Sequence, residues 1–184
     1  MNKNLPLSNI VVLDLTNVLS GPFATQILSD LGAEIIKVEK PNGDDSRKFG
    51  PFIKKRSSYF ISLNRGKKSI IIDFKNTEDK KIFKKLLAIS DVIIDNFKPG
   101  TLEKYGFSSS YLKKNFPSLI QTKISGFGET GPLRGNPAYD MIVQAMGGIM
   151  SITGKNKNET YRVGSSIGDI VAGLYAVIGV LTQI

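Results

Sequence analysis

Short apolar segments that alternate with helical patterns constrain the fold of this chain more than any other feature. Residues 9–15 are rich in β-branched side chains, which is typical of a strand buried on both faces of a parallel sheet. After a Ser-Gly-Pro turn at residues 20–22, apolar residues recur at helical spacing from Phe23 until Gly32 ends the helix. Residues 34–38 form the next predicted strand. This order of strand, helix and strand indicates a parallel pair with a right-handed crossover.

The same pattern continues downstream and predicts three further strands, at residues 67–73, 91–95 and 118–124. Between the first two of these, Asn76 is expected to cap a helix. The apolar side chains expected to face the core are Ile82, Phe83, Leu86 and Leu87, and the lysines expected to face water are Lys80, Lys81, Lys84 and Lys85. We therefore predict an α/β fold with a mostly parallel, Rossmann-like sheet and flanking helices, organised as a single domain.

Two residue types are missing from the sequence, and their absence limits the chemistry that the chain can perform. There is no cysteine, so neither a disulfide framework nor a thiolate metal site is available. There is also no histidine, which excludes catalysis by an imidazole. Any acid, base or nucleophile must therefore be Asp, Glu, Lys, Tyr, Ser or Thr, and no metal site is predicted.

The formal net charge of +9 is compatible with nucleic acid, a membrane surface or an anionic cofactor as a partner. The lysines are spread along the chain, however, without a basic tail and without stacking aromatic residues between them. We therefore expect no nucleic-acid partner. A bias in composition remains an alternative explanation for the excess of lysine.

The two ends of the chain indicate where the protein acts. The N-terminus has no apolar run before a small-residue cleavage site, so it does not resemble a signal peptide, and we expect a cytoplasmic protein. Residues 167–184 carry a single charge and approach transmembrane length. Because Asp169 lies near their start, glycine is frequent and no basic residue follows, we predict a buried core helix and no membrane association. A membrane tail anchor is the alternative.

Asp169 is the most conspicuous polar residue of that segment. It follows a turn of Gly and Ser, opens an apolar helical run, and has Gly173 one turn later on the same face. One interpretation is a first-turn residue, where the helix dipole favours a negative charge by about 0.3–1 kcal/mol. The other is a carboxylate nucleophile that the helix N-terminus keeps ionised and that small neighbours leave open to a substrate carbonyl. The pattern alone favours the first interpretation.

Two loops at the ends of predicted strands are candidate ligand contacts. The turn after the first strand lacks the G-x-G-x-x-G spacing of a dinucleotide site, and its Gly-Pro pair is either simple turn chemistry or a place for close backbone approach to a ligand. Asn96 and Phe97 follow the fourth strand, which is where open α/β sheets bind ligands. Phe97 could equally be a core residue at the sheet edge.

Several of these stretches, in order over essentially the whole chain, resemble the family III CoA-transferases, the group of formyl-CoA transferase and carnitine CoA-transferase. The matching segments are residues 12–15 with 20–24, 31–39, 68–70, 95–100, 125–128, 138–140 with 144–145, and 168–173. The resemblance implies the CoA-binding N-terminal part of a fold in which two longer chains interlock as a homodimer. Members of the family continue into a linker, a small domain and a returning C-terminal segment, which this chain is expected to lack, and the homodimer is doubtful without them.

The resemblance also implies a site and a reaction. Asp169 stands where the family keeps a catalytic aspartate, which forms an aspartyl anhydride and then an aspartyl-CoA thioester while CoA passes from an acyl-CoA to a small carboxylic acid. Backbone N–H groups of the glycine-rich turns are the expected oxyanion donors. The positions implied to contact coenzyme A are Leu19, Ser20, Lys40, Ile72, Lys75, Asn96, Phe97, Lys104 and Tyr139.

Two alternatives stay open beside the transferase. The chain could be a truncated remnant that binds CoA weakly or not at all and catalyses nothing. It could also, less favourably, be an isomerase like the 2-methylacyl-CoA racemases, which resemble the transferases in fold and pair a His with an Asp. Tyr139 stands at the position of that His, and the sequence has no histidine.

Overall fold

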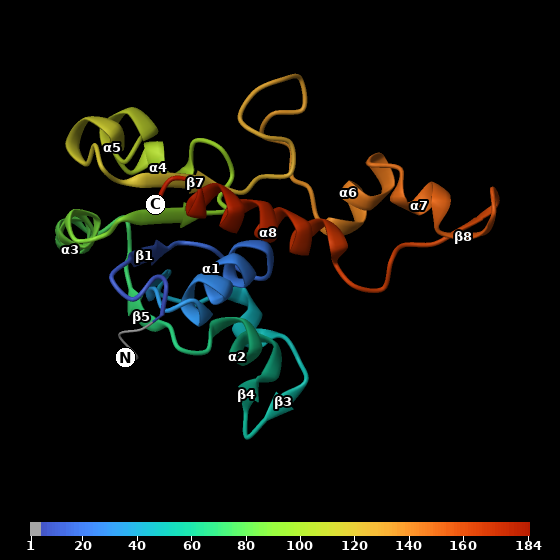
Figure 1. Cartoon of the computed structure of the whole chain (residues 1–184), viewed down its shortest axis with the longest axis horizontal. Helices are drawn as coiled ribbons and strands as arrows, with labels where there is room; N and C mark the ends of the chain where they lie inside the picture. Colours follow the sequence, from blue (N-terminus) through green and yellow to red (C-terminus); the bar gives the residue numbers. More distant parts are fainter. Residues whose placement is uncertain (1–4) are drawn as a thin grey trace.

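A five-stranded parallel sheet forms the centre of the computed structural model, which describes residues 5–184 (Figure 1). Its order is β5-β2-β1-β6-β7, and all four neighbouring pairs are parallel. The strands are β1 (Val11–Asp14), β2 (Glu34–Glu39), β5 (Lys68–Ile71), β6 (Val92–Asp95) and β7 (Ile120–Lys123). All five predicted strands are confirmed, with ends within two residues of those predicted, as is the α/β fold with a mostly parallel sheet.

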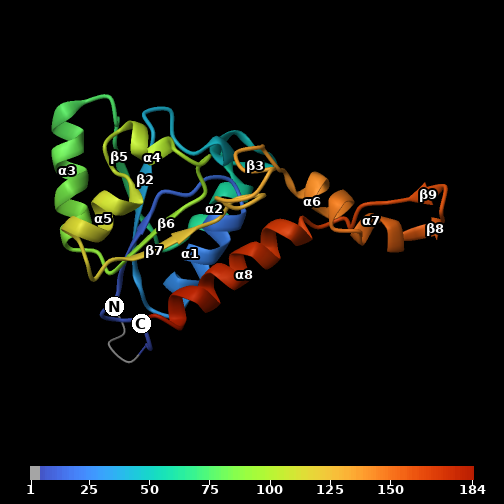
Figure 2. The same cartoon turned by 90° about the horizontal axis from the view of Figure 1, so that it is seen from above.

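Helices cover both faces of this sheet, as Figure 2 shows. On one face lie α1 (Ser20–Asp30) and α8 (Ile167–Leu181), and on the other lie α3 (Thr77–Ala88), α4 (Thr101–Lys104) and α5 (Ser109–Asn115). Successive strand residues point to opposite faces. Val12 therefore joins the first core, with α1 and α8, and Leu13 joins the second core, with α3, α4 and α5.

The helix predicted after Asn76 is α3, and its cap is confirmed. The Asn76 side chain accepts hydrogen bonds from the backbone N–H groups of Glu78 and Asp79. Phe83 and Leu87 are buried, but the prediction that Ile82 faces the core is wrong, because its side chain is 41% exposed. Successive residues of an α-helix are about 100° apart, so Ile82 falls beside the buried stripe. Of the four lysines, Lys81, Lys84 and Lys85 are exposed, whereas Lys80 is half-buried near the Tyr105 ring.

The prediction that the last helix is buried in the core is only partly correct, because α8 buries one face. The buried side is formed by Gly173, Ala176, Val177 and Val180. The opposite side is exposed and apolar, and it includes Val171, Leu174, Tyr175, Ile178 and Leu181. The helix packs against α1, the β7 edge and α6 (Asp140–Met146), and no other element of residues 5–184 covers its outer side. No helix in this part of the chain is long and apolar enough to cross a membrane.

Several short elements lie outside the predicted pattern. They are the 3₁₀ helix η1 (Asp45–Lys48), β3 (Phe52–Ile53), β4 (Arg56–Ser57), α2 (Ser58–Asn64), α7 (Ile149–Ile152), β8 (Gly154–Asn156) and β9 (Glu159–Thr160). The β3–β4 hairpin turns through Lys54 and Lys55, both with positive φ, where Asn-Gly is the usual sequence signal. Helices α6 and α7 and the β8–β9 hairpin extend away from the sheet at one end (Figures 1 and 2).

The strand order reverses between β1 and β6. From β1 the chain builds β2 and β5 on one side, and from β6 it builds β7 on the other. In open parallel sheets the loops that leave two such strands diverge and form a crevice at their carboxyl ends. A ligand-binding crevice is therefore expected at the loops that follow β1 and β6.

Candidate active site

A cleft of about 380 Å³ lies at the carboxyl ends of β1, β6 and β7, where the strand order reverses. Its walls come from the loops after β1 and β6, the start of the glycine-rich turn after β7, and the N-terminal parts of α6 and α8. This is the place where open α/β sheets bind ligands. Six of the ten residues predicted for the site line the cleft: Leu19, Ser20, Asn96, Phe97, Tyr139 and Asp169.

The other four predicted residues do not line it. The side chain of Ile72 is 2% exposed and belongs to the second core. The Nζ of Lys40 lies 2.8 and 2.9 Å from the two carboxylate oxygens of Asp45, which does line the cleft, so Lys40 stands just outside it. Lys75 and Lys104 are exposed on the surface. Their contacts with CoA remain predictions.

Phe97 and Tyr139 differ in how they contribute to the cleft. Phe97 is half-buried, packs against the second core and also lines the cleft, so both interpretations of its position hold. Tyr139 precedes α6 and is 82% exposed. An exposed aromatic side chain at the mouth of a cleft is available to a ligand.

Asp169 is the third residue of α8, and residues of α6 hold the segment that leads to it. The backbone N–H of Gly168 donates to Oδ1 of Asp140 at 2.8 Å. Gln144 accepts from the Val163 N–H at 2.8 Å and donates to Asp140 Oδ2 at 2.7 Å. A Cβ on Gly168 would lie 3.1 Å from Asp140 Oδ1, so glycine permits this close approach. The start of α8, and with it Asp169, is therefore fixed against α6.

Two further effects act on the Asp169 carboxyl besides the N-terminus of α8, which was predicted to keep it ionised. Burial and then the negative charge of Asp140 raise the pKa of the Asp169 carboxyl. Within residues 5–184, no hydrogen bond to its carboxylate offsets this effect. A carboxylate with a raised pKa and no hydrogen bonds is a more basic, more reactive nucleophile than a solvated one.

Gly173 itself serves the packing of two helices, whereas the small neighbours of Asp169 that line the cleft are Gly168 and Ala172. A Cβ at this position would lie 2.6 Å from the backbone oxygen of Ser20 and 3.1 Å from the Phe23 ring. The glycine thus lets α8 approach the first turn of α1 closely. This contact brings Asp169 to the same cleft as Leu19 and Ser20.

The side chain of Asn96 forms hydrogen bonds with the backbone of the loop after β1. Its Oδ1 accepts from the Asn17 N–H at 2.9 Å, and its Nδ2 donates to the Asn17 carbonyl at 2.8 Å. Both polar atoms of the amide are therefore occupied within the protein. The loops after β1 and β6 are joined by this pair.

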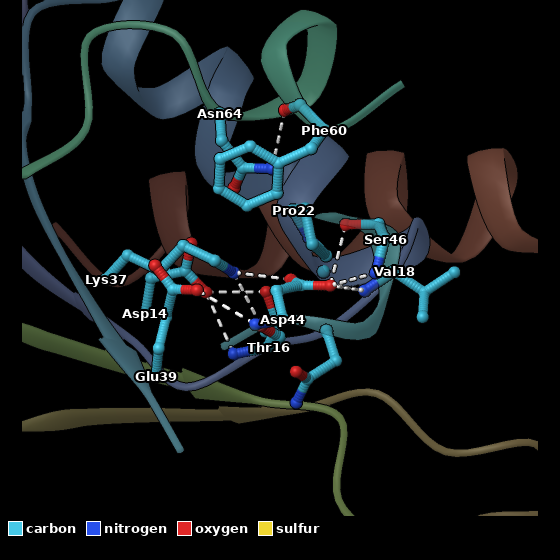
Figure 3. Close-up of polar contacts among 12 residues, drawn as sticks. Asp14, Thr16, Val18, Pro22, Lys37, Glu39, Asp44, Ser46, Phe60 and Asn64 are labelled. Atoms are coloured by element: carbon cyan, nitrogen blue, oxygen red, sulfur yellow. Dashed lines mark hydrogen bonds and ion pairs between the residues drawn. The ribbon is translucent and has the colours of Figure 1, made fainter. Parts of the chain in front are cut away.

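Sequence analysis missed a buried ionic cluster beneath the loop after β1, which Figure 3 shows. Lys37 pairs with Asp44 at 2.9 Å, and Lys67 with Asp14 at 3.1 Å, and all four side chains are at most 1% exposed. Burial lowers the pKa of Lys67 to about 8, although the charge of Asp14 opposes this shift. A lysine among the apolar residues of the strand predicted at residues 34–38 was the available signal for Lys37.

Tyr59 in α2 is a second residue that sequence analysis missed. Burial raises the pKa of its hydroxyl, and the negative charges of Asp169 and Asp44 add to the effect. Tyr59 therefore lies near enough to the candidate nucleophile to sense its charge. No motif in the sequence identifies it.

Among residues 5–184 no group of side chains is arranged to hold a metal ion.

Comparisons with known proteins show the family of the chain. Residues 7–184 match the model of CoA-transferase family III. The chain is 45% identical over 181 residues to the acetyl-CoA:oxalate CoA-transferase of Acetobacter aceti, covering 97% of this chain and 46% of that protein. It is 44% identical over 178 residues to the succinyl-CoA:glutarate CoA-transferase of Homo sapiens, covering 96% of this chain and 41% of that protein.

A solved structure supports the same relationship. The crystal structure of a CaiB/BaiF family protein from Brucella suis has a TM-score of 0.94 and 43% sequence identity, over 98% of this chain and 49% of that one. The chain thus spans about half the length of the relatives that it matches.

Proposed function

Because this chain belongs to CoA-transferase family III, we propose that its cleft binds an acyl-CoA and that Asp169 transfers CoA from it to a carboxylic acid. One observation carries the proposal: six predicted residues from separate parts of the sequence line a single cleft, and one of them is a carboxylate with a raised pKa. The names of the relatives, which pair an acyl-CoA with an acid such as oxalate or glutarate, support the substrate class.

In the proposed reaction the Asp169 carboxylate attacks the thioester carbonyl, the C–S bond breaks, and CoA leaves as a thiolate. The product is a mixed anhydride between Asp169 and the acyl group. The thiolate then attacks the Asp169 carbonyl of this anhydride, which releases the donor acid and leaves an aspartyl-CoA thioester. The acceptor carboxylate repeats the two steps in reverse order, takes up CoA and regenerates the Asp169 carboxylate.

This covalent route suits a transfer without an external energy source, because each step exchanges one activated acyl group for another. The cleft offers backbone donors for the oxyanion that forms at each carbonyl. The first N–H groups of α1 have no intrahelical partner, and Ser20 at its start lines the cleft, as does Gly126 in the turn after β7. A proton-transferring racemase is less well supported, since the chain has no histidine.

Intact mass of the protein after incubation with several acyl-CoAs, with and without hydroxylamine, tests the proposal. Hydroxylamine cleaves an aspartyl anhydride or thioester and leaves a hydroxamate, which peptide mapping locates. We expect an adduct at Asp169 that is absent from Asp169→Ala. Asp30→Ala removes an exposed aspartate of α1 and should leave the adduct unchanged.

The absence of an adduct from protein that circular dichroism shows to be folded would contradict catalysis by this chain. Calorimetric titration with CoA then separates the two remaining possibilities. Binding without an adduct would show that these residues bind CoA without reacting with it, and no binding would show that they do neither on their own.

A further inference from the structure

The buried pair of Lys37 and Asp44 lies directly beneath the loop that joins β1 to α1 (Figure 3). Taking two charges out of water is costly, and a buried ion pair is by itself weak evidence of stabilisation. The contacts that the pair makes therefore indicate what it holds. Lys37 Nζ donates to the Thr16 carbonyl at 2.7 Å, and Asp44 Oδ1 accepts from the Val18 N–H at 3.2 Å.

Asn96 holds the residue between these two contacts. Its amide binds both the N–H and the carbonyl of Asn17. The backbone of three successive residues is thus bound by side chains that come from β2, from the loop after it, and from the end of β6. We call Lys37, Asp44 and Asn96 the loop clamp.

The clamped loop is strained. Val18 has a φ of +67°, which is a rare conformation for a β-branched residue. The Leu19 N–H donates to the Asn17 carbonyl at 3.1 Å, which closes a γ-turn around Val18. A γ-turn with positive φ at its central residue is strained and persists only where its surroundings enforce it. Such strain clusters at functional sites. Asn17, Val18 and Leu19 all line the cleft.

We propose that Lys37 and Asp44 are positioning residues, which hold the γ-turn at Val18 in the form that the acyl-CoA requires. The inference rests on the proposed function, because the ligand is the acyl-CoA of that proposal. A glycine would adopt the positive φ without strain, but position 18 is a valine. Lys37 and Asp44 instead bind the backbone at Thr16 and at Val18. The clamp substitutes for the conformational freedom that glycine would supply.

The test replaces the ion pair by apolar residues of similar volume, in Lys37→Met/Asp44→Leu, so that neither charge is left buried alone. We expect CoA to bind about tenfold more weakly, because only the fraction of molecules with the left-handed turn binds. Adding Val18→Gly should restore most of the affinity, since glycine adopts the turn unaided, whereas adding Val18→Ala should not. Amide exchange of Leu19, whose N–H closes the turn, reports it through loss of protection in the double variant.

Lys68→Met is the matched control. Lys68 is the first residue of β5 and forms a solvent-accessible ion pair with Glu34, so its replacement should leave CoA affinity and Leu19 exchange unchanged. If the double variant does not fold, Asp44→Asn serves instead. This change keeps an oxygen for the Val18 N–H, removes the ion pair, and should weaken binding by about threefold.

A folded double variant with unchanged CoA affinity would overturn the positioning role, and so would failure of Val18→Gly to restore affinity. A wild-type chain that binds no CoA would overturn the proposed function, and the positioning role would fall with it. Wild-type binding with an unaffected clamp variant would overturn the positioning role alone.

Discussion

Neighbouring charges shift the pKa values of buried Asp14 and half-buried Asp169 in opposite directions. Although burial raises it, the pKa of Asp14 is held well below its usual range by Lys37 and Lys67. Asp169 has the carboxylate of Asp140 as its charged neighbour instead, and its pKa is raised. The first environment keeps a structural carboxylate ionised, and the second makes a carboxylate reactive.

Replacing Asp140 by Asn should shift the pH dependence of the reaction at Asp169. An amide oxygen can still accept the Gly168 N–H, but the negative charge is removed, so the pKa of Asp169 falls. Because the ionised carboxylate is the nucleophile, adduct formation rises with pH through this pKa, and in Asp140→Asn the rise should move to lower pH. The rate of adduct formation, followed by mass spectrometry from about pH 3 to about pH 7, measures the shift. An unchanged profile would show that Asp140 does not act on Asp169 by its charge.

Asp95 makes the folded protein sensitive to pH. Its side chain is 6% exposed, and burial raises its pKa to about 6 from 3.8, although the Phe97 N–H and Lys123 oppose the shift. Between these values the folded state holds a proton that the unfolded chain has released, so stability falls as pH rises from about 4 to about 6. A shift of about two units corresponds to roughly 3 kcal/mol.

Urea unfolding at both ends of that pH window tests this prediction. Asp95→Asn should remove most of the loss in unfolding free energy, while the exposed Asp30→Asn should retain it. An equal loss in wild type and Asp95→Asn would mean that another group is responsible.

At the scale of elements, the contact between α8 and α1 determines where Asp169, the proposed nucleophile, lies. Gly173→Ala would place a Cβ 2.6 Å from the Ser20 backbone oxygen, which cannot move without displacing α1. We expect the unfolding free energy to fall by about 1–3 kcal/mol and less adduct to form at Asp169.

Gly179→Ala in the same helix is the matched control. A Cβ there meets open space, so the better helix former should stabilise the protein by roughly 0.5–1 kcal/mol. Thermal unfolding of both variants gives the comparison, and equal effects would mean that helix propensity, not the contact with α1, governs position 173.

Elements whose signal is local were predictable, and those held together by distant contacts were not. The strands could be predicted because parallel strands are apolar on both faces. The start of α3 could be predicted because the Asn76 side chain caps its first turn. The rule that ligands bind at strand ends located Asn96. The proximity of Tyr59 to Asp169 depends instead on how α2 and α8 each pack against α1, which no local pattern encodes.

For the whole molecule, charge and apolar surface are distributed differently. The two cores enclose the sheet, the cleft lies at one end of it, and the outer side of α8 remains apolar and exposed. The net charge of +9 gives the molecule a general attraction for anions that does not depend on any one site. A ligand with several phosphates, such as CoA, should therefore bind more weakly as salt is added.

Lys104 and Lys113 can separate a specific phosphate contact from this general attraction. Both are exposed lysines on neighbouring short helices, α4 and α5, and only Lys104 is a predicted CoA contact. Lys104→Ala should weaken CoA binding about fivefold, equivalent to roughly 1 kcal/mol for an exposed ionic contact, and should reduce its salt dependence. Lys113→Ala should change neither. Titration calorimetry at two salt concentrations decides the matter: equal small effects of both changes would assign the attraction to the overall charge and would favour compositional bias as the origin of the lysines.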